Sequence, residues 1–227
     1  MIVAVHQPQY LPWLGYFDKI DKADIFVLLD TVQFKKNEWQ NRNKIKTAQG
    51  WQWLTVPVMY TYPQLINEVT INNRVNWQHK HRQALLSNYK RAPHFDMVER
   101  ILGEILSSSW DYISHLNIEA VKRLVTVLGI DTPLYIASEL GEFPQDPDER
   151  LVALTKHFGA GTYLAGIGGR EYMNLDIYNR NGIEVIFQDF RHPVYHQLFG
   201  GFEPFMSVID LILNHGDRSL TILRGKA

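Results

Sequence analysis

The chain contains no cysteine among its 227 residues, and this absence excludes several kinds of chemistry. Without cysteine there are no disulfides, no thiolate nucleophile and no zinc site with sulfur ligands. Long apolar runs are absent too, since none approaches the ~20 residues that cross a bilayer. The first residues also lack a basic segment followed by an apolar one, the pattern of a signal peptide. We therefore expect a cytoplasmic protein without membrane insertion.

A strong charge of one sign is also missing, because 23 basic and 24 acidic residues leave a formal net charge of −1. That balance gives no bulk attraction to nucleic acid, so we expect no nucleic-acid partner. Hydrophobic residues make up 45% of the chain, as in globular proteins that bury a core. No internal repeat or linker divides residues 1–227, which predicts one α/β domain.

The opening stretch organises the predicted fold. Val3 to Val5 is a short apolar run typical of a buried strand, and it stops at His6-Gln7-Pro8. Two prolines and a glycine then shape a turn, and residues 15–20 read as the start of a helix. A strand, a polar loop and a helix form the usual first unit of an open parallel sheet, whose ligands bind at the carboxyl ends of the strands.

The rest of the chain continues this alternation. Further strands are predicted at residues 25–29, 51–58, 134–137, 162–165 and 183–187, with one more short strand at 69–71. Residues 31–47 read as a long basic loop. Residues 76–128 have apolar side chains at three- and four-residue spacing, which predicts a largely helical segment. A final helix is expected at residues 205–214. The fold class is therefore α/β, with an open, mostly parallel, Rossmann-like sheet and a helical insertion.

Polar residues at strand ends are the first candidate site. His6 suits a general acid or base, or a hydrogen-bond donor to an oxyanion, and otherwise it holds the loop. Gln7 and Gln9 can hydrogen-bond a sugar hydroxyl or a base. Asp30 ends the second strand, where it binds ligand or caps the following turn. We expect His6 and Asp30 to be catalytic.

The basic loop supplies the second set of candidates, Asn41, Arg42 and Asn43. Amides beside a guanidinium suit a phosphorylated or carboxylated ligand. Trp39 nearby stacks on a sugar or base, or covers the core. We expect His6, Asp30 and Arg42 to meet around one hollow.

A glycine-rich turn adds Gly166, Gly168 and Arg170, which lie between a strand and a helix and can hold an anion. The spacing is not a dinucleotide fingerprint, and the chain has no P-loop lysine motif and no Gly-x-Ser-x-Gly elbow. No histidine spacing predicts a metal site. The sequence names no cofactor and leaves the oligomeric state open.

Several motifs together resemble the WbqC-like protein family. They are His6-Gln7-Pro8 with Tyr10-Leu11-Pro12 and Gly15-Tyr16-Phe17, then Asp30-Thr-Val-Gln33-Phe34, Asn37-x-Trp39-x-Asn41-Arg42-Asn43 and Tyr195-His196-Gln197. The resemblance spans nearly the whole chain. Leu164-Ala165-Gly166 departs from it, because many relatives have a serine before this glycine.

The resemblance implies work in the synthesis of O-antigen and other surface polysaccharides. We expect an enzyme that transfers a group, acyl or aminoacyl, to a phosphorylated or nucleotide-linked amino sugar. One alternative is ATP-dependent activation in the style of nucleotidylyl transfer. The first motif distantly resembles the phosphate-binding turn of that superfamily, but Pro12 and Gly15 stand where its histidines would be. The other alternative is a non-catalytic scaffold protein of a polysaccharide assembly complex.

Overall fold

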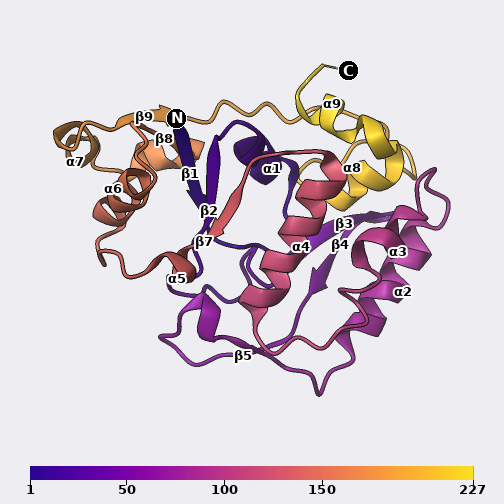
Figure 1. Ribbon diagram of the computed structural model, residues 1–227. Coiled ribbons are helices and arrows are strands. Elements are labelled where there is room, and N and C mark those ends of the chain that lie inside the picture. Colours follow the sequence, from indigo (N-terminus) through magenta and orange to yellow (C-terminus); the bar gives the residue numbers. More distant parts are fainter. Residues whose placement is uncertain (227) are drawn as a thin grey trace.

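A parallel sheet lies on one side of the molecule in the computed structural model, which describes residues 1–226 (Figure 1). Its strands are β1 (Ile2–His6), β2 (Ile25–Leu28), β7 (Leu134–Ile136), β8 (Thr162–Ala165) and β9 (Glu184–Phe187). They lie in the order β7-β2-β1-β8-β9, and every neighbouring pair is parallel. The predicted α/β class is confirmed, and the first strand lies at the centre of the sheet.

Strand residues alternate between two hydrophobic clusters, one on each face of the sheet. In β1, Ala4 belongs to the larger cluster, whereas Val3 and Val5 belong to the smaller one. All three are nearly inaccessible to solvent, which explains the continuous apolar run in the sequence. The helices that bury residues in the larger cluster include α1 (Leu14–Asp21) and α4 (Ile113–Leu128). The smaller cluster is completed by α5 (Ala137–Leu140), α6 (Pro147–His157) and α7 (Leu175–Arg180).

The long connection from β2 to β7 builds a second part of the structure, to the right of the sheet in Figure 1. In chain order it contains β3 (Arg42–Thr47), β4 (Gly50–Thr55), β5 (Val58–Met59), β6 (Thr70–Ile71), α2 (Trp77–Tyr89), α3 (Met97–Leu102) and α4. β3 and β4 pair antiparallel, as do β5 and β6, and neither pair joins the parallel sheet. Within residues 76–128, the helices α2, α3 and α4 are joined by turns and loops at residues 90–96 and 103–112.

The sequence predicts a basic loop at residues 31–47, but the structure has strand β3 in the second part of this range. Its inward residues are Asn43 and Ile45, which are 1% and 0% exposed, and its outward residues include Arg42 and Lys44. A buried amide in place of an apolar side chain hides the alternation that marks a half-buried strand. The hairpin is therefore visible only in the structure.

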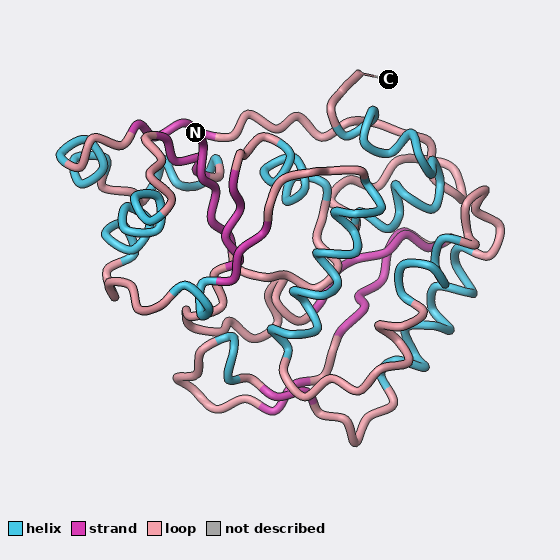
Figure 2. The backbone as a smooth tube through the Cα atoms, in the orientation of Figure 1, coloured by secondary structure: helices cyan, strands magenta, loops and turns pink. Residues whose placement is uncertain are grey.

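The chain ends with α8 (Val208–His215) and α9 (Ser219–Leu223), which pack together. Short 3-10 helices occur at η1 (Ile66–Glu68), η2 (Ile167–Glu171) and η3 (Gly216–Arg218). Figure 2 shows a long segment without helix or strand, residues 188–207, that joins β9 to α8 across the molecule. The carboxylate of Asp210 on α8 accepts hydrogen bonds from the Tyr195 hydroxyl and from Gln197 Nε2, and these bonds fix part of this segment.

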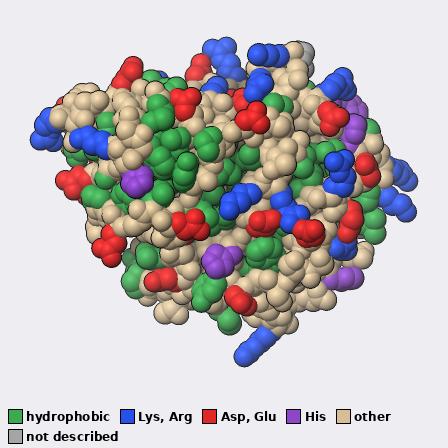
Figure 3. Space-filling model, in the orientation of Figure 1, with side chains coloured by type: hydrophobic (Ala, Val, Ile, Leu, Met, Phe, Trp, Pro, Cys, Tyr) green, Lys and Arg blue, Asp and Glu red, His purple; other side chains and the backbone are tan. Residues whose placement is uncertain are grey.

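Basic and acidic side chains are intermingled on the face of the molecule that has α4 in front (Figure 3). This face therefore presents no field of one sign, in keeping with the balanced composition. Of the helices within residues 1–226, none has both the length and the apolar character needed to cross a membrane.

Candidate functional site

A crevice of about 440 Å³ opens at the carboxyl ends of β1, β2 and β8. Its walls also come from α1 and α6, and they include His6, Gln7, Lys19, Leu29, Arg150 and Gly166. The strand order reverses between β1 and β8, because the chain moves from β1 outward to β2 and β7 and then returns to β8. Open parallel sheets bind ligands at such a switch point. We call this hollow the β1–β8 crevice.

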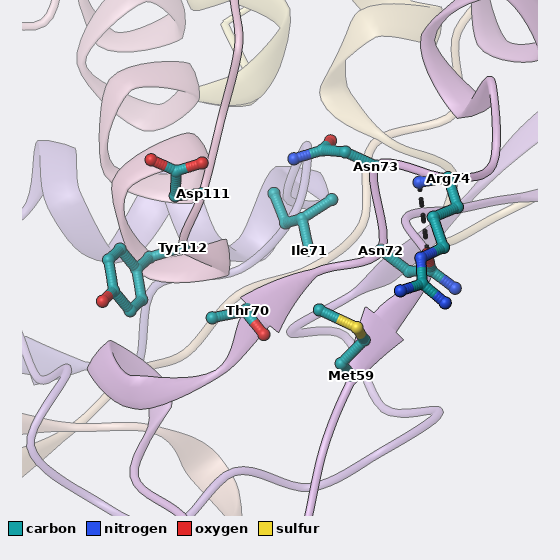
Figure 4. A pocket seen from close by; sticks show the side chains of 8 residues that line it. All are labelled: Met59, Thr70, Ile71, Asn72, Asn73, Arg74, Asp111 and Tyr112. Atoms are coloured by element: carbon teal, nitrogen blue, oxygen red, sulfur yellow. Dashed lines mark hydrogen bonds between the residues drawn. The ribbon is translucent and has the colours of Figure 1, made fainter.

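Another hollow lies beside β6, and Figure 4 shows its side chains. Asn72, Asn73 and Arg74 follow the strand, and Asp111 and Tyr112 lie opposite. The backbone N–H of Arg74 donates to Asn72 Oδ1 at 3.2 Å, so the turn satisfies its own polar groups. The Asn, Arg, Asp and Tyr side chains here are at least partly exposed. This hollow therefore lacks the buried ionisable groups that make the β1–β8 crevice the stronger candidate.

His6 lines the β1–β8 crevice at the end of β1, as predicted. Its Nδ1 lies 3.1 Å from the carbonyl oxygen of Gln7. A carbonyl oxygen only accepts hydrogen bonds, so Nδ1 carries the hydrogen and neutral His6 keeps its lone pair on Nε2. Burial, together with the positive charge of Lys19, lowers the pKa of His6 to about 4. His6 is therefore a neutral proton acceptor at pH 7.

Lys19 on α1 is a second ionisable group in the crevice, and sequence reasoning missed it. The side chain is buried, with the residue only 4% exposed, and its Nζ donates to the carbonyl oxygen of Val5 at 2.9 Å. Burial lowers the pKa of Lys19 to about 7. A signal was present, because this lysine falls among Tyr16, Phe17 and Ile20 in a helix that must pack on the sheet. Such an amine is costly to bury and is typical of functional sites.

The charge of the β1–β8 crevice is positive. Lys19, Lys35 and Arg150 contribute cations, and within the described part of the chain no Asp or Glu lines the crevice. Arg150 is oriented by two backbone carbonyls, which accept from its Nε at 2.9 Å and its Nη2 at 2.6 Å. A partly enclosed hollow with cations and no carboxylate favours an anionic ligand, since burial strengthens each charge interaction.

Among the predicted ligand-binding residues, Gln7 and Gly166 line the crevice. The side chain of Gln7 is fixed, because its Oε1 accepts from Gln40 Nε2 at 2.7 Å. Gly168 and Arg170 belong to η2 and are exposed rather than part of the crevice wall. The guanidinium of Arg170 instead stacks on Phe187 at 4.8 Å from the ring centre. Only the first residue of the glycine-rich turn is therefore placed to touch a ligand in the crevice.

Asp30, predicted to be catalytic, is only 2% exposed and does not line the crevice. Its Oδ1 accepts from the backbone N–H of Ser138 at 3.0 Å, and its Oδ2 accepts from the Ser138 hydroxyl at 2.6 Å. Both oxygens are thus used to join the end of β2 to the start of α5. This geometry suits a structural carboxylate rather than one that contacts a ligand.

The predicted cluster around Arg42 lies outside the crevice wall as well. Asn41 Nδ2 donates to the carbonyl of Val56 at 3.1 Å, and Asn43 Nδ2 donates to the carbonyl of Leu11 at 2.7 Å. Both amides therefore hold backbone rather than ligand. Gln9 is buried beneath the first loop, and Arg42 lies on the hairpin. The expected meeting of His6, Asp30 and Arg42 does not occur, and His6 meets Lys19 instead.

Within residues 1–226, no group of three or more histidine, aspartate and glutamate side chains is arranged to hold a metal ion.

Comparison with known proteins gives two matches. The sequence pattern described as the WbqC-like protein family matches residues 7–222. The chain is also 37% identical over 226 residues to "Uncharacterized protein Rv1507c" of Mycobacterium tuberculosis, covering 98% of this chain and 97% of that protein. No solved structure gives a significant match.

Proposed function

The chain belongs to the WbqC-like protein family, and from that premise we propose that it transfers an acyl or aminoacyl group to an amino sugar carrying a phosphate or nucleotide. The observation that carries the proposal is the presence of His6 and Lys19 together in a crevice that no Asp or Glu of residues 1–226 lines. The family resemblance supports a place in surface-polysaccharide synthesis. The positive crevice supports a phosphorylated substrate.

The two ionisable groups suit complementary roles. Protonated Lys19 holds the phosphate or diphosphate of the sugar, and its charge helps to keep His6 neutral. The sugar amine then attacks the carbonyl carbon of an activated donor. A C–N bond forms, the bond to the leaving group breaks, and the proton of the amine passes to His6 Nε2 and from there to the leaving group. Gln7 and Gly166 orient the sugar at the crevice mouth.

The test begins with calorimetry against a panel of nucleotide sugars, followed by turnover with activated acyl and aminoacyl donors. We expect His6→Gln to lower kcat about 100-fold with little change in KM, because it removes the proton acceptor but keeps a polar side chain. Lys80→Met, an exposed lysine on α2, is the matched control and should leave both constants unchanged. Absence of binding across the panel, or full turnover by His6→Gln, would discard the proposal. Binding of ATP in place of nucleotide sugars would favour the activating enzyme instead.

The value of kcat/KM should depend on pH and should fall on both the acid and the alkaline side of a maximum. A group whose pKa is lowered in the folded protein loses its proton early, so Lys19 becomes neutral above about pH 7. His6 becomes protonated below about pH 4. We therefore expect kcat/KM to be highest between these values, to fall on the alkaline side as Lys19 loses its charge, and to fall on the acid side as His6 gains one.

A diester such as UDP-N-acetylglucosamine is the suitable ligand for this measurement, because its diphosphate loses no proton in the range. Its affinity, measured by calorimetry from pH 6 to 9, should weaken as pH rises. The same series on Lys19→Met should be flat. If the affinity changed with pH equally in both proteins, Lys19 would not be the group that causes the pH dependence.

A further inference from the structure

One face of the β3–β4 hairpin carries tryptophans and cations side by side. Lys44 pairs in register with Trp53, and Arg42 and Trp51 lie two residues away along the two strands on the same face. The ring centres of Trp51 and Trp53 are 5.4 Å apart, and those of Trp53 and Trp39 are 5.7 Å apart. Trp51 is 43% exposed, although tryptophan is usually covered. We call these five residues the tryptophan row.

The cations of the row are held against the indole rings. The guanidinium carbon of Arg42 is 4.1 Å from the centre of Trp53, and Lys44 Nζ is 4.1 Å from the centre of Trp51. No carboxylate within residues 1–226 forms an ion pair with either cation. Arg42 Nε is buried without a hydrogen-bond partner. Stacking fixes the two charges in place, and the outer edge of a stacked guanidinium suits a carboxylate or phosphate.

The tryptophan row begins close to the wall of the β1–β8 crevice. Gln40 is the neighbour of Trp39 in the chain, and its side chain donates to Gln7 Oε1 at 2.7 Å. The carbonyl of Trp39 accepts from the backbone N–H of Tyr10 at 3.0 Å. Gln7 lines the crevice, so the hydrogen bond from Gln40 joins the crevice wall to the residue next to Trp39 in the chain. From there the row follows the hairpin toward its turn.

From this geometry we propose that the tryptophan row binds an acidic oligosaccharide. Indole faces pack well against the apolar C–H faces of sugar rings, and the unpaired cations select a chain that carries carboxylates or phosphates. The planes of Trp51 and Trp53 lie at 79° to each other and those of Trp53 and Trp39 at 57°, so the rings offer a ligand edges as well as faces. Any part that this oligosaccharide plays in the reaction of the β1–β8 crevice rests on the proposed function.

The same features argue against single-stranded nucleic acid as the occupant. Nucleic acid binders gain their affinity from many phosphate contacts along a basic groove. Here the row offers Arg42 and Lys44 alone, and the chain as a whole has a net charge of −1. A ligand with sparse negative charge and many apolar C–H faces fits this balance better.

The probes are a tetramer of galacturonic acid and its methyl ester, which share one sugar chain and differ in that the ester has uncharged methyl carboxylates. Calorimetry should give a Kd for the acid at least about 10-fold tighter than for the ester, and tighter than for a thymidine oligonucleotide of equal charge. Trp51→Ala and Lys44→Met should each weaken binding of the acid about 10-fold. Tyr112→Ala, which removes another exposed ring (38%) outside the row, is the matched control and should change nothing.

Equal binding of acid and ester, tighter binding of the oligonucleotide, or no loss in the two variants would each overturn the inference, as would no binding at all. Lys19→Met tests whether the tryptophan row and the crevice are separate binding sites. This variant should leave tetramer binding unchanged. Conversely, Trp51→Ala should leave the affinity for UDP-N-acetylglucosamine unchanged. Nucleotide sugars could fail to bind while tetramer binding still depends on the row. That result would contradict the proposed function but would still support the tryptophan row as a binding surface for an acidic oligosaccharide.

Discussion

The Lys19→Met variant should bind a nucleotide sugar about 10-fold more weakly and turn it over about 100-fold more slowly, and yet be more stable than the native protein. The reason is that Nζ of Lys19 is buried with a backbone carbonyl as its hydrogen-bond acceptor. The carbonyl of Val5 neutralises no charge, so folding must remove an ammonium from water or remove its proton. Methionine keeps the length of the side chain and removes this cost.

The stability of the native protein should depend on pH through Lys19. Burial lowers the folded pKa of Lys19 to about 7 from an ordinary 10.5, so the unfolded chain binds one more proton between these values. The free energy of unfolding of the native protein should therefore rise from pH 7 to pH 9, by at most roughly 1.4 kcal/mol per pH unit from this group. Urea unfolding of both proteins at pH 7, 8 and 9 should show the gap between them closing as pH rises.

Lys80→Met again serves as the control, because its ammonium is already exposed to water. A Lys19→Met protein that is less stable than the native one and still fully active would mean that the lysine is a structural part of the core. The predicted combination, higher stability with lost binding, is the signature of a group held in place for function.

Asp210→Ala should be the most destabilising substitution, by about 3 kcal/mol or more in urea unfolding. Asp210 is inaccessible to solvent. Its Oδ1 accepts from the Tyr89 hydroxyl at 2.7 Å, and its Oδ2 accepts from the Tyr195 hydroxyl at 2.9 Å and from Gln197 Nε2 at 2.8 Å. Removing the carboxylate leaves three buried donors without an acceptor, in positions that tie α2 and residues 195–197 to α8.

The Asn variant at position 210 should cost less than alanine, because a hydroxyl can rotate to accept a hydrogen bond from the new amide. Asp217→Ala, an exposed acid on η3, is the control and should change the unfolding free energy by less than about 0.5 kcal/mol. Burial raises the pKa of Asp210, so its contribution is complete in acid and weakens as pH rises through the folded pKa. An alanine variant with native stability would show that water replaces the network.

The parallel sheet could be predicted from the sequence because its strands are short, mostly apolar runs, and those of β1, β2 and β9 stop at a polar residue. His6 could be located for the same reason, since position at a strand end follows from local pattern alone. The same local pattern could not show that Lys19 lines the crevice and that Asp30 does not. Whether a polar side chain faces a crevice or a neighbouring backbone depends on partners far away in the chain, such as Ser138 for Asp30. The strand of Arg42 reads as a loop because the amide of Asn43, flanked by two cations, stands where an apolar residue would mark a half-buried strand.

The central position of β1 has a consequence for synthesis on the ribosome. Residues 2–6 emerge before the other strands of the sheet, and β2 can pair with them on one side almost at once. The other side of β1 pairs with residues 162–164, which are made more than 150 residues later. Until then the nascent chain carries an open hydrophobic edge, the kind of surface that chaperones protect and that aggregates when translation stalls.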